Sequence, residues 1–410
     1  MGVFYNAISV VSQRIRNLAA RSGKYSGHLA TAMRTILATL LALLLSTVLA
    51  EPFSVSTSAL FSSPEKKDFQ MPDLFAQIAD HRPVRTLEDR IILVNIGRAG
   101  REEIAEGLSL LSLCGPRAIG IDINFADTTG FDGPLLEAIS CNPGIVFPLG
   151  LSSDDNGRFS ISDVPFFYGL EGLDVNYGVT NLPSKTEKAT IREYAVDFDT
   201  DKGNVPSFVT RLASLAYPES VGRLKAHGEK LGVTSYHSRE FNVVELPDIE
   251  RQAELFADKI VMIGTLDDAS DMHATPVNSY MPGLMLHAHA LATVLDGTWF
   301  HKTSRTFDYL AAILICLVIT GMAFAIKSRF RGVILRVTQV VLAYLAVRLG
   351  YSAFIDHNLL FDFTHTLLII AFGLFAVDIW NGLEETGHRL LARAARKHKR
   401  KQSLSCEKLY

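Results

Sequence analysis

Four long apolar runs stand out in the pattern of hydrophobic and polar positions along the chain. One lies near the N-terminus, over 35–50, and three follow one another near the C-terminus, over 309–326, 333–354 and 359–380. A helix needs about 20 predominantly apolar residues to cross the hydrocarbon core of a bilayer, and each run approaches that length. The preceding HLATAMR lengthens the first run. The pattern therefore predicts a transmembrane region of four α-helices.

Between these runs, residues 51–306 alternate between strand-like and helix-like patterns. RIILVNIG, RAIGIDINF and GIVFPLG are apolar runs of strand length, and REEIAEGLSLLSLC and DGPLLEAIS between them have helical spacing. Further along, REYAVDF, FNVVEL and KIVMIGT are of strand type, and SFVTRLASLAY and GLMLHAHALATVLDG are of helix type. The order βαβαβ predicts an α/β domain with a largely parallel central sheet.

Basic residues gather in three segments that lie on the same side of the membrane if the chain crosses it four times. Residues 1–34 hold five Lys and Arg and no acid, the connection KSRFRG holds three, and 381–410 holds eight against three Glu. The positive-inside rule places these segments in the cytoplasm, so that 51–306 is extracytoplasmic. That segment holds 22 Lys and Arg against 36 Asp and Glu, an excess of 14 negative charges. Such a surface argues against nucleic acid as a partner and favours cations, cationic ligands or another protein.

The chain is thus predicted to have five segments. They are a basic cytoplasmic N-terminus (1–34), a transmembrane helix or signal anchor (35–50), an extracytoplasmic domain (51–306), three transmembrane helices (307–380) and a basic cytoplasmic tail (381–410). VLA before Glu51 fits a signal-peptidase site, but the long stretch before the apolar run favours an uncleaved anchor. HRLLARAARKHKRK is expected to extend the last span as a basic helix, which either stops transfer or meets an acidic partner or anionic headgroups.

Two cysteines fall in the predicted outer domain, where oxidation is permitted. Cys114 and Cys141 both stand in a Cys-x-Pro sequence at a helix-to-strand junction, in SLCGPRAIGID and ISCNPGIVFPL. Successive units of a parallel sheet bring such junctions to the same end, so a disulfide between the two is one interpretation. Two unbonded thiols are the other.

Polar residues follow the predicted strands at their carboxyl ends, where open α/β sheets bind ligands. The candidate ligand-binding residues are Arg98, Asp122, Asn124, Thr265, Asp268, Asp271 and His273, with Asn95 and Asp127 beside them. Because each follows a strand by at most a few residues, we expect Asp122, Thr265, Asp268, Asp271 and His273 at one end of the sheet. The alternative for each residue is a capping role that satisfies backbone donors.

The stretch 267–291 matches none of the common catalytic or metal-binding patterns. His287 and His289 are two residues apart on a predicted helix, so they point about 200° away from each other and do not bind one ion together. The calcium loop with its closing Glu, the G-x-S-x-G and H-E-x-x-H motifs and the phosphate loop are all missing from the sequence. We therefore expect no enzyme, no cofactor and no metal. His287 either braces the loop or contacts a ligand.

In combination these segments resemble the type-two CHASE domain, a cyclase- and histidine-kinase-associated sensory extracellular domain. In that family a K-I-V-hydrophobic-I-G strand leads to an Asp, a T-P pair, a P-G pair and a helix that opens with H-A. RAIGIDINFAD, with Asp122 and Phe125 in place, DGPLLEAI and IREYAVDFD resemble further family segments. The matching positions of the main segment are 259–265, Asp271, Thr275, Pro276, Pro282, Gly283, His287 and Ala288.

The resemblance implies a sensor in the bacterial inner membrane whose periplasmic domain binds an envelope ligand or protein. The family layout of one span, an outer sensor and three closely spaced spans covers nearly the whole chain. Such sensors usually continue into a cyclase or kinase domain, whereas 30 residues follow Trp380. We therefore expect a separate cytoplasmic signalling effector as partner, and a homo-oligomer as a further option. A membrane-tethered envelope enzyme or a structural subunit of a membrane complex is the alternative.

Charged residues inside membrane spans are normally paired. The connection IDHN makes the last two predicted spans antiparallel neighbours. Arg348 then lies at the depth of Asp362 and His365, and Arg336 lies at the depth of Asp378. We expect Arg348 to contact Asp362 or His365 and Arg336 to contact Asp378, with separate snorkelling to the headgroups as the alternative for the inner pair.

Overall fold

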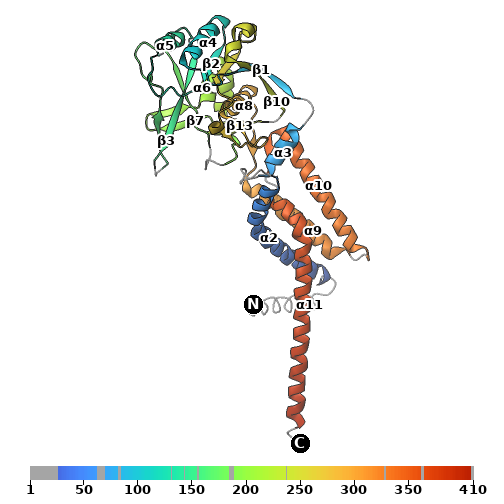
Figure 1. Cartoon of the computed structure of the whole chain (residues 1–410). Coiled ribbons are helices and arrows are strands. Elements are labelled where there is room, and N and C mark those ends of the chain that lie inside the picture. The colour runs from blue at the N-terminus through green and yellow to red at the C-terminus, as the bar shows by residue number, and fades with distance from the viewer. Residues whose placement is uncertain are drawn as a thin grey trace. The chain divides into compact units, whose positions relative to one another are not determined.

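The computed structural model separates the chain into two compact units. One is Val55–His301, which contains the large sheet, and the other combines Met1–Ser54 with Lys302–Tyr410, which contain most of the long helices (Figure 1). The structure describes residues 26–407 except 62–69, 82–84, 131, 143, 155–156, 184–188, 237, 327–328 and 362–363. Asp362 and most of the basic N-terminal segment 1–34 therefore lie outside the described residues.

Four long helices carry the apolar runs. They are α2 (Ser26–Phe61), α9 (Arg305–Ala325), α10 (Arg331–His357) and α11 (Thr364–Glu407). Each contains a segment that is long and apolar enough to cross a membrane: His28–Leu49, Thr306–Ala325, Arg331–His357 and Thr364–Gly387. The prediction of four candidate spans is confirmed. The first begins before residue 35 because HLATAMR continues the helix.

Buried hydrogen bonds join these helices in pairs. The hydroxyl oxygens of Thr39 on α2 and Thr320 on α9 lie 2.9 Å apart. Gln339 Nε2 on α10 donates to the Ile370 carbonyl on α11 at 2.6 Å. Such bonds satisfy polar groups where a bilayer offers no water. α11 is 44 residues long, which confirms that HRLLARAARKHKRK extends the last span as a helix.

The predicted ion pair between Arg336 and Asp378 does not form. Arg336 Nη1 donates to Gln339 Oε1 on its own helix at 2.9 Å, and both Arg336 and Asp378 are exposed. The rotation of α10 explains this result, because the helix buries a different set of positions: Leu335, Gln339, Ala346, Gly350 and Phe354.

At the other end of α10 the structure tests only the predicted contact between Arg348 and His365, because Asp362 lies outside the described residues, and that contact does not form. Arg348 is exposed, and the His365 ring lies against Tyr309 of α9, with 4.8 Å between ring centroids. Within the described part of the chain, no ion pair reaches Arg348. A sequence pattern gives the depth of a charge along a helix but not the direction in which it faces.

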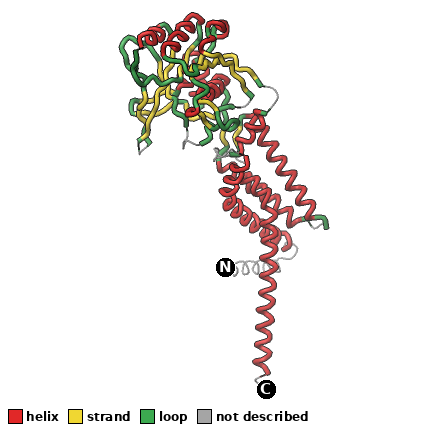
Figure 2. Tube along the Cα trace, viewed as in Figure 1, coloured by secondary structure: helices red, strands yellow, loops and turns green. Residues whose placement is uncertain are grey.

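A nine-stranded sheet forms the centre of the α/β unit (Figure 2). Its strands are β1 (Thr86–Asn95), β2 (Ala118–Ile121), β3 (Ile145–Ser153), β4 (Phe159–Asp163), β5 (Asn176–Val179), β7 (Asp197–Thr200), β8 (Gly203–Pro206), β10 (Arg239–Glu245) and β11 (Ile260–Gly264). The order is β10-β1-β11-β2-β3-β4-β7-β8, and β5 pairs with β3. The pairs from β10 to β3 are all parallel, which confirms the predicted sheet.

Helices cover both faces of this sheet. They are α4 (Arg101–Cys114), α5 (Asp132–Ser140), α6 (Phe208–Ala216), α7 (Pro218–Ala226) and α8 (Gly283–Asp296). Successive side chains of a strand point to opposite faces. Ile91 and Leu93 of β1 therefore pack with α6, α7 and α8, whereas Ile92 and Val94 pack with α4 and α5. The unit is a three-layer α/β/α fold.

Shorter elements complete the fold. They are α3 (Met71–Asp80), β6 (Glu193–Ala195), β9 (Leu231–Val233), β12 (Met272–His273), β13 (Met281–Pro282), β14 (His301–Lys302), β15 (Leu359–Leu360) and 3₁₀ turns at Leu246–Asp248, Glu250–Leu255 and Ala269–Asp271. β6 pairs antiparallel with β9, and β12 pairs antiparallel with β13. The single predicted strand REYAVDF is thus two strands, β6 and β7, in different sheets.

The interpretation of Cys114 and Cys141 as a disulfide is wrong, because both are unbonded thiols. The ends of α4 and α5 are staggered. Asn142, next to Cys141, donates to the Leu108 carbonyl at 3.0 Å, and Leu108 precedes Cys114 by six residues, or about 9 Å of helix. The Cys114 thiol donates to the Leu110 carbonyl of its own helix instead.

Candidate functional site

Three neighbouring strands end together at the carboxyl edge of the sheet. Asn95 of β1 is in register with Gly264 of β11, and Ile263 of β11 is in register with Ile121 of β2. The Asp122 amide donates to the Ile263 carbonyl at 2.8 Å, just past the end of β2. The structure therefore brings Asp122 and the segment that begins at Thr265 to the same end of the sheet.

Asn95 fixes the chain where it leaves β11. Its Oδ1 accepts a hydrogen bond from the Leu266 amide at 3.1 Å, and its Nδ2 donates to Asp267 Oδ2 at 3.3 Å and to Glu245 Oε2 at 3.1 Å. Asn95 is 6% exposed, so these bonds satisfy a buried amide. The role of Asn95 is to hold the loop, as the capping alternative predicted.

A small hairpin follows this loop and leads into α8. β12 and β13 form its arms, and Thr275 closes its tip with three hydrogen bonds to Asn278: amide to carbonyl at 2.7 Å, hydroxyl to carbonyl at 3.0 Å and the Asn278 amide to the hydroxyl at 3.1 Å. Thr275 is completely buried. The polar stretch of the sequence is therefore in part a structural element, a hairpin closed by Thr275.

Asp271 lies against the start of α8. A Cβ on Gly283, the first residue of that helix, would come within 2.4 Å of Asp271 Oδ2, so only glycine leaves room for the carboxylate. A carboxylate is stabilised beside the amide end of a helix, where backbone N–H groups point outward. His273 Nε2 lies 3.1 Å from Asp271 Oδ1 and orients it further.

His287 lies one turn into α8 and is 8% exposed. Its ring packs edge-on against Phe208 of α6, with 5.6 Å between ring centroids. His289 packs instead against Tyr236 and Phe241 at 5.4 and 5.0 Å. The prediction that the two histidines face different surroundings is confirmed.

Asp122 lacks a hydrogen-bond partner for its carboxylate among the described residues. Loss of water around it raises its pKa, and the charge of Asp271 raises the pKa further, while His287 and His273 act in the opposite direction. These four side chains, Asp122, Asp271, His273 and His287, are called the acid–histidine cluster below. Its chemistry suits a ligand that brings positive charge or hydrogen-bond donors to Asp122.

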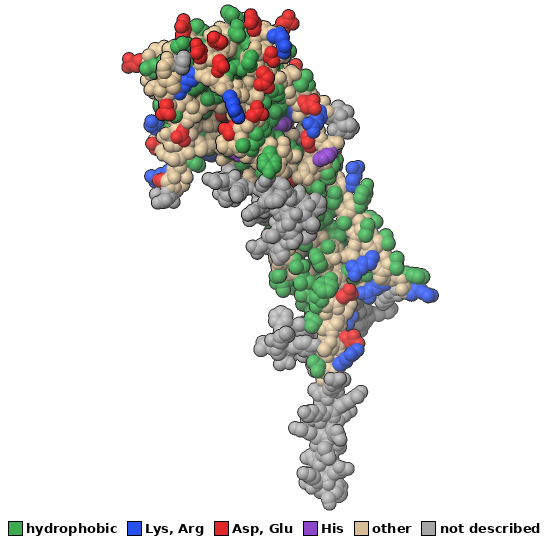
Figure 3. Space-filling model, in the orientation of Figure 1, with side chains coloured by type: hydrophobic (Ala, Val, Ile, Leu, Met, Phe, Trp, Pro, Cys, Tyr) green, Lys and Arg blue, Asp and Glu red, His purple; other side chains and the backbone are tan. Residues whose placement is uncertain are grey.

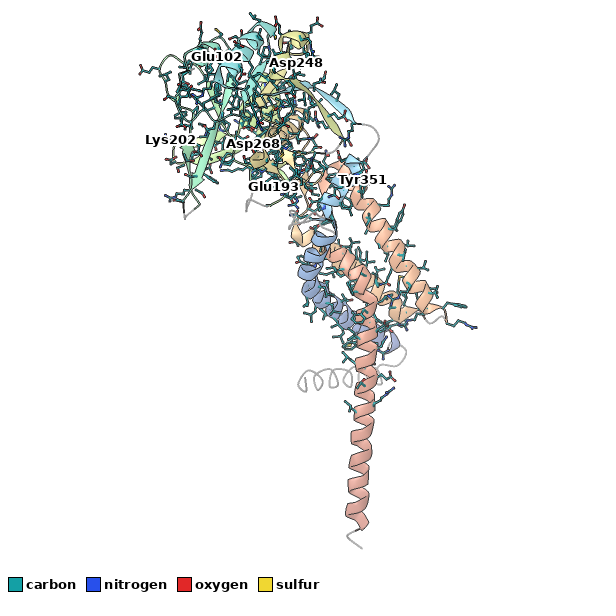
Figure 4. All side chains as sticks on the ribbon, viewed as in Figure 1. Glu102, Glu193, Lys202, Asp248, Asp268 and Tyr351 are labelled. Carbon is teal, nitrogen blue, oxygen red and sulfur yellow. The ribbon has the colours of Figure 1, made fainter. Side chains whose placement is uncertain are left out.

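The other candidate residues lie outside this cluster. Asp268, labelled in Figure 4, is exposed and caps its own turn, because Oδ1 accepts from the Ser270 amide at 2.8 Å and hydroxyl at 2.7 Å. These bonds lower the pKa of Asp268. Thr265 Oγ1 accepts from the Asp267 amide at 3.4 Å. The remaining three are exposed: Arg98, Asn124 and Asp127.

Arg101 is a neighbour of this edge that the sequence did not indicate. Its guanidinium lies 5.4 and 5.3 Å from the ring centroids of Phe125 and Phe166, and its Nη1 pairs with Asp132 at 2.5 Å. It also donates to the Asp127 carbonyl, so it holds the loop after β2. The REE sequence at a helix start gave no signal that the arginine would be sandwiched between aromatic rings.

No group of three or more His, Cys, Asp or Glu that could hold a metal ion occurs in the described part of the chain. Figure 3 shows Asp and Glu side chains spread over the visible face of the α/β unit. On this face the acidic side chains are spread out rather than gathered in one patch.

Replacing Asp122 with Asn should stabilise the unliganded protein. Because the pKa of Asp122 is raised in the folded state, its charged form costs stability, and this cost grows as the pH rises above the unfolded value of 3.8. We expect the Asn variant to unfold about 2–4 °C higher at pH 7, with the difference gone below about pH 3.8. Asp268→Asn should shift the midpoint downward, because that pKa is lowered. A lower midpoint for Asp122→Asn at pH 7 would contradict the argument.

Comparison with known proteins gives one match. Residues 88–323 match the family model described as the CHASE2 domain, which is more than half of the 410 residues. Neither the curated proteins nor the solved structures contain a match to this chain.

Proposed function

This chain belongs to the CHASE2 domain family, a family of sensory domains, and we propose that it is a membrane-anchored sensor. In this proposal the α/β unit lies outside the cytoplasmic membrane of a bacterium, binds a ligand or protein at the acid–histidine cluster, and relays the change to a separate cytoplasmic effector. Its role is binding, without a catalytic step. The observation that carries the proposal is a hydrogen bond between the β12–β13 hairpin and α3, the helix that follows the first candidate membrane helix in the chain.

Recognition would centre on Asp122. A cationic or hydrogen-bond-donating group of the ligand would give this carboxylate the partner that the described residues do not provide. The excess of acidic residues in 51–306 attracts cations over a longer range. Ligand charge would also act on the adjacent Asp271–His273 pair, which holds the start of α8 and the base of the hairpin.

The hairpin is bonded to α3. Gln77 Nε2 of α3 donates to the Pro276 carbonyl at 2.9 Å, across 199 positions of sequence. The neighbouring Ala274 carbonyl accepts from the Ile191 amide at 2.7 Å. If ligand binding changed the position of the hairpin, the change would therefore reach α3 through a direct hydrogen bond.

α3 is firmly held in the domain. Arg192 donates to Asp73 with Nε at 2.8 Å and Nη2 at 2.7 Å, and Asp73 is 4% exposed. Phe75 and Ala79 of α3 are buried. α3 follows α2 in the chain, so in this proposal a displacement of α3 would be passed on to the first membrane helix along the backbone.

The cytoplasmic side is assigned from charge. The basic residues near the start of α2 and the end of α11 favour that side for both helix ends. Arg34 of α2 and Glu384 of α11 form an ion pair at 2.6 Å, which couples the two helices near the start of α2 and near the end of the apolar span Thr364–Gly387 of α11. The extension of α11 to Glu407 would offer the effector a basic helix.

The binding step can be tested on the full chain in lipid nanodiscs. Small primary amines such as ethanolamine are titrated, with acetamide as a neutral control, and the thermal midpoint is recorded. We expect a saturable rise of several degrees, since a ligand at 100 times its Kd adds about 2.7 kcal/mol. The rise should be lost in Asp122→Asn and kept in Asp268→Asn. The absence of a rise with every amine would overturn the assignment of a cation-binding site.

The relay step has its own measurement. Hydrogen exchange of α3 and of α2 is compared with and without amine in the wild type and in Gln77→Leu. We expect the variant to keep the thermal shift and to lose the ligand-dependent change in both helices, with α5 unchanged as internal control. A ligand-dependent change in α2 that survives in Gln77→Leu would show that another route carries the signal.

A further inference from the structure

The two ends of the large sheet differ in how open they are to a further strand. The strand order begins with β10 and ends with β8. β8 has four residues, of which the first is glycine and the last is proline, and both residue types weaken strand pairing. β10 has seven residues and contains neither, and it lies beyond β1 at one side of the sheet (Figure 1). Of the two ends, β10 is therefore the one that can pair with another strand.

Every second residue of β10 points its backbone groups away from β1. The Thr86 amide of β1 donates to the Ser238 carbonyl at 2.9 Å, so the backbone groups of Ser238 face β1. Direction alternates along a strand, and the register shift between the two strands lies in β1, so Asn242 also faces β1 while Phe241 and Val243 face away. No hydrogen bond between described residues reaches these outward groups. β10 thus presents a row of free backbone donors and acceptors.

The middle of β10 lacks the features that usually protect a sheet edge. Proteins block edge strands with lysine, proline or a bulge. Positions 241–244 are Phe, Asn, Val and Val, and none of them is charged. Val243 is 43% exposed. An edge that combines free backbone groups with apolar side chains is a template for an added strand.

The sequence of β10, REFNVVE, is complementary to itself in the antiparallel direction. If two copies of the strand pair about Asn242, Arg239 of one copy lies opposite Glu245 of the other, and Phe241 lies opposite Val243. Opposite charges and aromatic with β-branched residues are both favourable cross-strand pairs. Arg239 already bonds Glu88 and Asp296, but a guanidinium has five N–H donors, so donors remain for Glu245. This complementarity favours a second copy of the chain as the occupant of the edge.

We propose that β10 pairs antiparallel with β10 of a second copy, so that two large sheets join across a two-fold axis at Asn242. Phe241 and Val243 then exchange N–H···O bonds with Val243 and Phe241 of the second copy. Asn242 lies opposite itself as a non-hydrogen-bonded pair, in which the Cα atoms are about 4.5 Å apart. Such an interface uses the same surface on both copies. It is separate from the acid–histidine cluster and does not depend on the ligand proposed for that cluster.

A cysteine on the two-fold axis tests this register. In the full chain in detergent, Cys141→Ser and Cys406→Ser first remove two native thiols. We expect Asn242→Cys to form a covalent dimer on mild oxidation, because about 4.5 Å between Cα atoms suits a disulfide. Glu240→Cys is the control. The Glu240 side chain is 59% exposed, but its Cα would lie about 14 Å from that of Glu240 in the second copy, too far for a bond. Non-reducing gels compare the two yields.

A proline at the edge tests the backbone pairing. Val243→Pro removes an outward N–H and no bond to β1, so the monomer should keep its fold, as checked by circular dichroism. We expect the Kd of the dimer, from sedimentation equilibrium, to rise roughly 10- to 100-fold, because each copy loses one N–H···O bond. Val243→Thr keeps the N–H and the branched side chain and should leave this Kd unchanged.

Several results would overturn the proposal. These are equal disulfide yields for Asn242→Cys and Glu240→Cys, a dimer that Val243→Pro does not weaken, and a wild-type chain that stays monomeric at every concentration tested. An adduct of Asn242→Cys with a different protein in the membranes of the producing cells, in place of the covalent dimer, would show that another chain occupies the edge.

Discussion

Replacing Glu88 with Gln is expected to cost about 3–5 kcal/mol of unfolding free energy, the range for breaking a buried charge pair. Glu88 is 5% exposed and accepts hydrogen bonds from Arg90 Nε at 2.7 Å, Arg90 Nη2 at 2.6 Å and Arg239 Nη1 at 2.6 Å. Asp296 at the end of α8 pairs with both arginines, at 2.5 and 2.6 Å. The hydrogen bond to Glu88 raises the pKa of Arg90, and a neutral amide at position 88 would leave Asp296 as the one carboxylate shared by the two charged guanidinium groups.

The adjacent acid provides the control for this experiment. Asp89 is 74% exposed at its side chain and lies 3.6 Å from Lys259, so Asp89→Asn should change stability by less than about 0.5 kcal/mol. Denaturant unfolding of the full chain, followed by Trp299 emission in the Trp380→Phe background, measures both variants. A loss below about 1 kcal/mol for Glu88→Gln would mean that the arginines find other partners.

Gly178→Ala is the second substitution from which we expect a large loss, about 2–4 kcal/mol. A Cβ at this position of β5 would come within 2.5 Å of Phe208 Cα and 2.8 Å of Phe208 N. Both atoms belong to the backbone at the start of α6, so no rotation of a side chain relieves the contact. The strand and the helix would have to separate, and the Val179–Ser207 bridge beside them would be disturbed.

Gly222→Ala is the matched control, because a Cβ there meets no atom within 4 Å. Gly222 lies inside α7, where alanine is the better helix former, so the substitution should stabilise the protein by up to about 1 kcal/mol. The two Gly-to-Ala changes therefore have opposite signs in the same denaturant experiment. Similar midpoints for the two variants would contradict the close approach of β5 and α6.

The sequence predicted the fold correctly wherever the period of the hydrophobic pattern and the direction of the strands determine it. Apolar runs of strand length, separated by helices, predicted parallel strands, and parallel strands must end together. This is why Asp122 and Thr265 could be placed at one edge of the sheet from the sequence alone. The four candidate spans followed in the same way from length and composition alone.

The side-chain contacts of the site and the orientations of the helices depend on contacts between segments that are far apart in the chain. Gln77 meets Pro276 and Asp73 meets Arg192 because α3 packs on the domain, and nothing in their local sequence indicates a partner. The position of Asp271 beside Gly283 depends on the hairpin that brings these two residues together. The rotation of α10 and the stagger of α4 and α5 are likewise packing results, and they overturned the predicted ion pair of Arg336 and the disulfide interpretation.

The burial of α8 has a consequence for energetics across the domain. All its residues except Met285 and Asp296 are buried, so the helix moves as a rigid rod or not at all. The acid–histidine cluster touches its first residue, and its last residue, Asp296, pairs with Arg90 and Arg239. Thermodynamic reciprocity then applies: if a ligand at the first end strengthens the ion pairs at the last, weakening those ion pairs lowers the affinity for the ligand by the same factor. The ion pairs at one end of the helix would therefore set part of the affinity at the other.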